Sequence, residues 1–234
     1  MKKNQYPKGS AKYRGKKKRR KMRFKKIMII LLFLIIIGAV IMGIVRALEH
    51  RGILADERQL PEIEDVEAIR PEMTVALLTP NTYSRPQTAL ENVNGIVIHY
   101  TANPGTTAMN NRDYFEGLKD SGNAYVSSHF VVGIEGEIVQ CIPTNEIAYA
   151  SNERNADTIS IEVCHVDETG EFTNQTYDSL VALTGWLCLY LDVDVDNVIR
   201  HYDVTGKNCP KYYVEHEDAW EDFKEDVWQW VLSR

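Results

Sequence analysis

An uninterrupted apolar stretch, residues 27–45, divides the chain into two parts of opposite character. Its 19 residues include no charged side chain. At about 1.5 Å of rise per residue, a helix of this length matches a bilayer core of roughly 30 Å. A buried core helix is the alternative, but such a helix is rarely apolar on every side. The stretch therefore predicts a transmembrane helix.

The charges on either side of this stretch predict its orientation. Residues 1–26 hold 14 of the chain's 27 Lys and Arg residues and none of its 33 Asp and Glu residues. Positively charged flanks stay in the cytoplasm, so we expect residues 46–234 to lie outside the cell. Residues 45–47 fit the cleavage site of a signal peptide poorly, which favours a retained anchor over a cleaved leader. A nucleic-acid-binding arm is the other reading of the tail, but a topology signal that also attracts anionic lipid is more economical.

The remainder of the chain is acidic, with 13 basic against 33 acidic residues. Such a balance argues against a nucleic-acid-binding domain, which needs a basic surface to neutralise phosphates. Residues 46–76 combine acidic side chains with prolines, a composition that indicates an extracellular linker. We therefore expect four parts: a basic cytoplasmic tail (1–26), an anchor (27–45), a linker (46–76) and one compact domain (77–234).

Hydrophobic patterning within the compact domain predicts an α/β fold. Runs rich in β-branched residues predict strands at 95–101, 126–134, 137–143, 158–164 and 198–202, the second and third forming a hairpin. Apolar residues at helical spacing predict helices at 108–119, 176–191 and 217–232. Strands and helices that alternate in this way predict a single domain with a central mixed β-sheet flanked by helices.

Residues 198–210 bring the most chemistry together in the shortest stretch. After a short apolar strand come His201, Asp203, Lys207 and Cys209, and the nearby Gly and Pro predict a fixed loop rather than a helix. Imidazole and thiolate are both zinc donors, but one of each cannot close a site, so a further ligand has to come from elsewhere. Asp203 either orients a ligand imidazole or caps the loop, and we favour capping.

Three further polar residues lie in predicted strands. His99 and His129 are candidate ligands, although each taken alone fits a satisfied core histidine. A period of two places Glu162 with Ser160 and Cys164 on one strand face, opposite the apolar side chains. A glutamate in mid-strand is unusual. It either forms a salt bridge on a solvent face or points into a cleft.

The sequence does not determine whether the four cysteines form disulfides. In an exported chain the four cysteines could form disulfides; they are Cys141, Cys164, Cys188 and Cys209. If Cys209 binds a metal, three cysteines remain, and three cannot all pair. Cys188 fits a small buried hydrophobe on a helix. The sequence leaves undecided whether Cys141 and Cys164 form a disulfide.

Four motifs occur in a characteristic order: VIHYTA (97–102), SHFVV (128–132), ISIEVC (159–164) and RHYDVTGKNCP (200–210). Together they resemble the zinc N-acetylmuramoyl-L-alanine amidases of the type-2 amidase family, which share a fold with the peptidoglycan recognition proteins. The resemblance covers about residues 77–232. It implies that His99, His201 and Cys209 are zinc ligands.

The resemblance also assigns catalytic and substrate residues. Glu162 matches the catalytic glutamate and Lys207 the active-site lysine of related enzymes. Tyr100, Ser128 and His129 are expected to contact substrate. The chain departs from the family at two places. Ser128 stands where some members have a catalytic tyrosine, and Ala150 stands where many have a histidine.

The implied reaction is zinc-dependent hydrolysis of the amide bond between N-acetylmuramic acid and L-alanine in bacterial peptidoglycan. Three protein ligands leave a fourth zinc position open, as in hydrolytic rather than structural sites. The alternative function is a non-catalytic muropeptide-binding module of the same fold, but such members usually lack the metal cysteine. We therefore expect an enzyme held at the cell membrane by a single-pass anchor, with its catalytic domain facing the cell wall.

Overall fold

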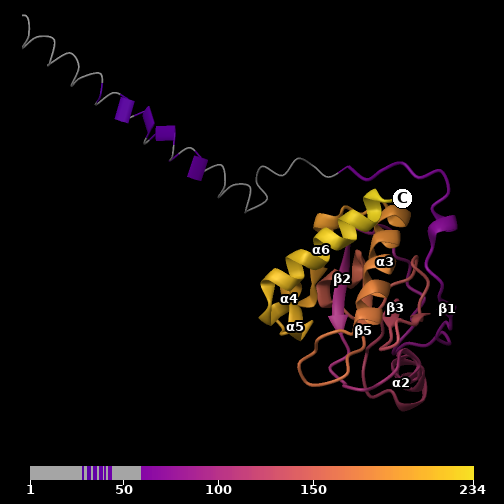
Figure 1. Cartoon of the computed structure of the whole chain (residues 1–234). Coiled ribbons are helices and arrows are strands. Elements are labelled where there is room, and N and C mark those ends of the chain that lie inside the picture. Colours follow the sequence, from indigo (N-terminus) through magenta and orange to yellow (C-terminus); the bar gives the residue numbers. More distant parts are fainter. Residues whose placement is uncertain are drawn as a thin grey trace, which may run out of the picture. The chain divides into compact units, whose positions relative to one another are not determined.

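The computed structural model describes residues 59–234 and, before them, residues 28, 31, 32, 34, 35, 37, 38, 40, 42 and 43 (Figure 1). The expected basic tail lies outside the described residues, as do part of the expected anchor and residues 46–58 of the expected linker. No helix among the described residues is long and apolar enough to span a bilayer. The chain forms two units, Met1–Glu57 and Arg58–Arg234. The second unit is described below.

A six-stranded sheet forms the centre of this unit, with the strand order β1-β4-β3-β5-β2-β6. All neighbouring pairs are parallel except β3 and β4, which are antiparallel. The predicted mixed sheet and the predicted hairpin are therefore confirmed. The strands are β1 (Thr74–Val75), β2 (Gly95–Tyr100), β3 (Phe130–Val132), β4 (Ile138–Gln140), β5 (Thr158–Val163) and β6 (Val198–Arg200).

The three predicted helices form close to their expected bounds. Thr107 begins α2 by accepting a hydrogen bond from the Asn110 backbone N–H, and Gly122, in the left-handed region, ends it. Thr173 caps α3 in the same way. The helices are α2 (Ala108–Ser121), α3 (Asn174–Leu191), α4 (His201–Thr205), α5 (Lys211–Glu215) and α6 (Glu217–Leu232), and the 3-10 helices are η1 (Glu67–Ile69), η2 (Asn152–Ala156) and η3 (Val195–Asn197).

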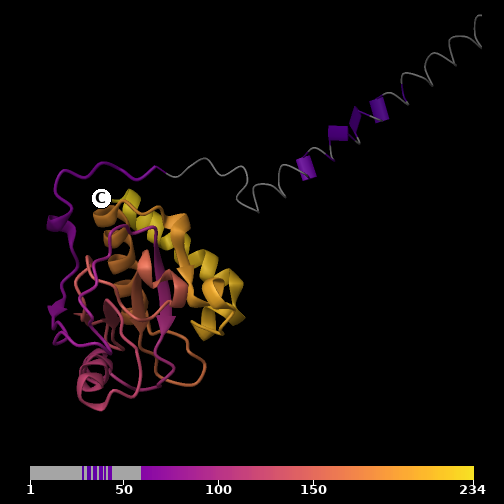
Figure 2. The same cartoon turned by 180° about the vertical axis from the view of Figure 1, so that it is seen from behind.

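The two faces of the sheet carry different cores. On one face α3 and α6 lie side by side (Figures 1 and 2) and pack against strand residues that include Ile98 and Ile161. On the other face Ala108 and Phe115 of α2 pack against Val131 and neighbouring side chains. Because side chains alternate along a strand, the residues between the buried isoleucines point away from α3 and α6. This alternation directs His99 and Glu162 to the second face.

The segment after β6 differs from the prediction. A fixed loop is expected there, but the strand ends at Arg200 and the short helix α4 follows at once. Asp203 starts this helix by accepting a hydrogen bond from the Arg200 backbone N–H at 2.8 Å. Gly206, with a φ of 75°, ends it. Asp203 therefore caps this segment, the role favoured from the sequence.

Part of the segment expected as a linker lies against the domain. From residue 60 onward it contributes apolar side chains to the core beside α3, namely Leu60, Val66, Ile69 and Met73. The indole N–H of Trp186 donates a 3.1 Å hydrogen bond to the Val66 carbonyl. Apolar residues that recur between the acidic ones thus hold residues 60–73 on the domain surface.

Candidate metal centre

Three potential ligands meet at one edge of the sheet. His99 lies at the carboxyl end of β2, and His201 is the first residue after the parallel neighbour β6. The β2–β6 register pairs Ile98 with Arg200, and the two histidines are the residues that follow this pair. Cys209 comes from the turn between α4 and α5. Its backbone carbonyl accepts a 2.8 Å hydrogen bond from the Tyr202 N–H, which ties this turn to α4.

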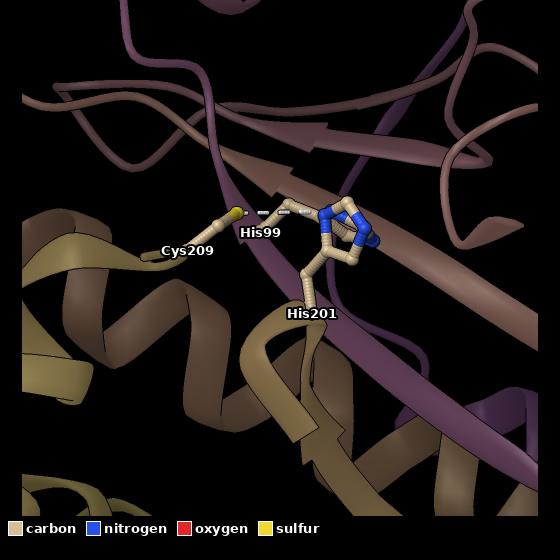
Figure 3. Close-up of side chains that lie close together, drawn as sticks. All are labelled: His99, His201 and Cys209. Carbon is tan, nitrogen blue, oxygen red and sulfur yellow. Dashed lines mark hydrogen bonds between the residues drawn. The ribbon is translucent and has the colours of Figure 1, made fainter. Parts of the chain in front are cut away.

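The side chains of these three residues converge (Figure 3). Their potential ligand atoms all lie within 4.8 Å of one another. The two imidazole centroids are 4.6 Å apart, and Cys209 Sγ lies 3.9 Å from His99 Nδ1. All three residues are buried. A site of two nitrogen donors and one sulfur donor suits zinc.

Electrostatics keep both imidazoles neutral. Burial, together with the nearby His201 and Lys207, holds the pKa of His99 well below its usual value. Burial and Lys207 also lower the pKa of His201. Neutral imidazoles keep a lone pair for a metal ion. Burial raises the pKa of the Cys209 thiol to about 12, so a metal would have to displace its proton.

One unsatisfied atom indicates where an ion would bind. Within the described part of the chain, Nδ1 of His201 is buried and has no hydrogen-bond partner. Buried polar atoms normally have a partner, and a free imidazole nitrogen beside a thiol and a second imidazole is suited to bind a metal ion. The residues present therefore fit a zinc ion.

Glu162 lies directly beside this centre. The β2–β5 register pairs it with His99, and its Oε2 atom is buried without a hydrogen-bond partner among the described residues. Burial raises the pKa of Glu162 to about 8, with the positive charge of Lys207 acting in the opposite direction. A carboxyl group whose pKa lies near neutrality can both accept and return a proton. The strand period left a solvent face and a cleft open for this side chain, and in the structure it lines the cleft.

The centre opens into a cleft of about 380 Å³. Lys207 and Tyr100 line it, as the sequence predicted, together with Glu162 and the three potential ligands. The rest of its wall consists of Tyr125, Val126, Tyr149, Ala150, Asn152 and Asn155. Of these, the sequence pointed only to Ala150, the position where many family members have a histidine. Lys207 is exposed and Tyr100 is partly exposed, so both are accessible from the cleft.

Two of the expected substrate residues lie elsewhere. Ser128 and His129 are fully buried before the start of β3. The Ser128 hydroxyl donates to the Phe130 and Ser160 carbonyls, and His129 bonds to the Ser160 hydroxyl and the Glu146 carbonyl. The structure corrects this prediction, because these side chains join the hairpin to β5 and do not reach the cleft.

Two polar residues that the sequence did not reveal contact the ligand histidines. Nε2 of His99 lies 3.1 Å from Ser151 Oγ, and Nε2 of His201 lies 3.0 Å from Asn152 Oδ1. Ser151 immediately precedes η2 and Asn152 is the first residue of η2, a segment too short for strand or helix periodicity to mark a functional position. The only available signal was a short polar run.

The cysteines are all free and buried. Cys141 and Cys164, for which a disulfide stayed open, both contribute to the core under α2. Burial raises the pKa of each thiol to about 12. Cys188 is buried within α3, as expected.

Comparison with known sequences gives one family and several relatives. The family model "N-acetylmuramoyl-L-alanine amidase" matches residues 89–212. The amidase CwlL of Bacillus licheniformis is 35% identical over 160 residues, which are 63% of this chain and 44% of the relative. The amidase BlyA of Bacillus subtilis (strain 168) is 33% identical over 175 residues, 66% of this chain and 46% of the relative. The chain thus spans less than half the length of these curated relatives.

Solved structures show the same fold. The structure of PlyL superposes with a TM-score of 0.58 at 25% identity, covering 67% of this chain and 97% of PlyL. The solution structure of the PlyG catalytic domain gives a TM-score of 0.58 at 26% identity, covering 67% of this chain and 93% of that domain. Both superpositions cover nearly the whole of the solved chain and leave a third of this one unmatched.

Proposed function

This chain belongs to the N-acetylmuramoyl-L-alanine amidase family, and from that premise we propose that it hydrolyses the amide bond between N-acetylmuramic acid and L-alanine in peptidoglycan, with zinc as cofactor. The observation that carries the proposal is the convergence of His99, His201 and Cys209 within 4.8 Å beside the buried carboxyl group of Glu162. The names of its relatives support the same activity.

Each site residue has a role in this proposal. His99, His201 and Cys209 hold the ion. When bound, zinc acts as a Lewis acid and lowers the pKa of a coordinated water to about 7. Glu162 removes a proton from the water that attacks the lactyl carbonyl carbon. It then returns that proton to the alanine nitrogen as the C–N bond breaks. Lys207 donates to the carbonyl oxygen as negative charge develops there.

The alternative is a module that binds muropeptides without cleaving them. Such a module needs the cleft but neither a metal nor a proton-transferring carboxylate. The unpartnered Nδ1 of His201 and Oε2 of Glu162 favour the enzyme, because a pure binding site has no reason to leave these buried atoms unsatisfied.

We also propose that residues 27–45 anchor the chain in the cell membrane, with the catalytic domain outside and facing the wall. The support is the 19-residue apolar stretch and the basic residues before it. Peptidoglycan is then the partner on the outer side and the bilayer is the partner of the anchor.

A defined muropeptide tests the proposed reaction. The full chain, purified in detergent, is incubated with a disaccharide–peptide, and the products are identified by mass spectrometry. We expect a disaccharide ending in free N-acetylmuramic acid and a peptide beginning with L-alanine. A chelator should abolish both products and added zinc should restore them. Binding without cleavage would support the alternative module, and cleavage at another bond would contradict the amidase assignment.

A further inference from the structure

We propose that residues 150–155 form an outer clamp, in which Ser151 and Asn152 fix the orientation of the two candidate ligand imidazoles and Asn152 also fixes the tautomer of His201. The inference rests on the proposed zinc function. Each ligand histidine turns one ring nitrogen toward the shared centre and offers the other to this segment. One short segment therefore contacts both imidazoles on the side that faces away from the shared centre.

The chemistry of Asn152 selects one tautomer of His201. An amide oxygen can only accept a hydrogen bond, so Nε2 of His201 must carry the hydrogen that Asn152 Oδ1 receives at 3.0 Å. Nδ1 then keeps its lone pair, and Nδ1 is the buried atom without a partner among the described residues. Metal-bound histidines typically donate their other ring N–H to an oxygen in this way.

Ser151 positions the other imidazole, His99, but a hydroxyl can donate or accept and does not by itself select the tautomer. Its hydroxyl lies 3.1 Å from Nε2, while Nδ1 of the same ring faces Cys209 Sγ at 3.9 Å. Only 1% of the surface of Ser151 is exposed, so water cannot replace its hydroxyl. The Nε2–H tautomer satisfies the serine oxygen and leaves Nδ1 free to bind a metal.

The clamp is itself held in place. The side-chain oxygen of Asn155 accepts hydrogen bonds from the backbone N–H groups of Ala150 at 3.0 Å and Ser151 at 2.6 Å. Asn152 adopts a φ of 53°, a left-handed conformation that is uncommon outside glycine. The side chain of this same residue contacts His201. Asn152 is exposed, so its amide group could bond to water, yet it bonds to the imidazole. Backbone strain at such a position is typical of a functional constraint.

Substitutions at position 152 separate the contribution of the Asn152 side chain to zinc affinity from that of its left-handed backbone. Asn152→Gly tolerates the left-handed conformation but removes the acceptor, and Asn152→Asp keeps an acceptor. Gln87→Gly is the matched control, because Gln87 is also left-handed, with a φ of 57°, but does not line the cleft. Zinc affinity, measured by competition with a chelator, should fall about 10–100-fold in Asn152→Gly and in Ser151→Ala. It should stay within about threefold in Asn152→Asp and in the control.

Thermal unfolding of each metal-free variant shows whether it folds. If Ser151→Ala fails to fold, the Asn152 series still decides the matter. Unchanged zinc affinity in Asn152→Gly would overturn the role of Asn152 as a clamp, and this measurement does not depend on amide hydrolysis.

A second measurement reads the tautomers directly. In the metal-free full chain labelled with ¹⁵N, the histidine ring nitrogens should show hydrogen on Nε2 of both His99 and His201. Asn152→Gly should convert His201 to a mixture of tautomers and leave His99 unchanged. Hydrogen on Nδ1 of His201 in the unaltered chain would mean that Asn152 presents its NH₂ group, which would overturn the proposal. Because no substrate is present, the result stands apart from whether the chain is an amidase.

Discussion

His99 and Glu162 lie opposite each other in the parallel register of β2 and β5. The two side chains point to the same face of the sheet, away from α3 and α6. A candidate metal ligand and a carboxyl group are thus fixed near the carboxyl ends of adjacent strands rather than on loops. Sites built on strands hold their geometry more precisely than sites on loops.

Replacing Glu162 by glutamine should lower turnover by roughly 10²–10⁴, the usual size of a general acid–base contribution. The amide fills the same space but cannot carry the proton, so zinc content and fold should stay unchanged. The measurements are the rate of muropeptide hydrolysis and the metal content of the same preparation. Asp113→Asn, which alters an exposed carboxylate on α2 away from the cleft, is the control. Equal turnover in the Glu162→Gln variant would place the proton transfer on another group.

Glu116 should make the stability of the domain depend on pH. Burial alone would raise the pKa of this carboxyl group, but hydrogen bonds from Lys119 and Thr79 outweigh burial and lower the pKa to about 2. A folded-state pKa below the unfolded value stabilises the fold above about pH 4.5, and this stabilisation is lost as the pH falls toward 2. Glu116→Gln should therefore lower the free energy of unfolding at pH 7 by about 1–3 kcal/mol.

Denaturant unfolding at several pH values measures this effect. The difference between the parent chain and Glu116→Gln should shrink between pH 4.5 and pH 2. Asp113→Asn, on the same helix and paired at its exposed surface with Arg112, should change stability by less than about 1 kcal/mol. A Glu116→Gln difference that is the same at pH 7 and pH 3 would show that the carboxylate charge is not what stabilises the fold.

The sequence predicted those features that periodicity determines. Alternation along β5 placed Glu162 on the face opposite the apolar side chains but left open whether that face meets solvent or a cleft, and the apolar spacing of α3 and α6 predicted both helices. The candidate metal ligands were identified from the motifs around His99 and His201 and not from periodicity, because a histidine in a strand fits a core position equally well. Ser128 and His129 were misplaced because the motif that contains them says nothing about which side chains the hairpin turns inward.

Other features depend on contacts between distant segments, which no local pattern encodes. Ser151 and Asn152 reach the ligand histidines only because β5 and β2 are neighbours, and their own segment has no regular period. The α4 helix is too short to show helical periodicity, and Asp203 and Gly206 define it only after β6 has ended. The packing of residues 60–73 depends on the Val66 carbonyl meeting Trp186, more than a hundred residues away.

Protease treatment should show on which side of the membrane the domain lies. The 14 basic residues before residue 27 predict a cytoplasmic tail. Protease added to intact protoplasts should therefore remove the domain and leave the tail, which antibodies against each part would detect. A domain that is digested only after the protoplasts are lysed, or a mature chain that begins near residue 48, would contradict the retained anchor.

Cys209→Ser should separate catalysis from recognition. A zinc-bound cysteine is a thiolate whose negative charge balances part of the ion's charge, whereas serine is a weak neutral donor. Zinc should therefore bind much less tightly. Most of the cleft wall comes from other residues, so muropeptide affinity measured by calorimetry should change little. A large loss of muropeptide affinity would mean that Cys209 shapes the cleft itself.

The most direct test of the amidase assignment is the appearance of amino-terminal L-alanine in purified peptidoglycan. Hydrolysis of the muramoyl amide frees one alanine amino group for each bond cut, and cleavage between sugars frees none. The full chain with zinc should release amino-terminal L-alanine steadily, and the Cys209→Ser variant should release it at the background rate. Wall that loses turbidity without new amino-terminal L-alanine, or equal release by both proteins, would contradict a zinc amidase centred on His99, His201 and Cys209.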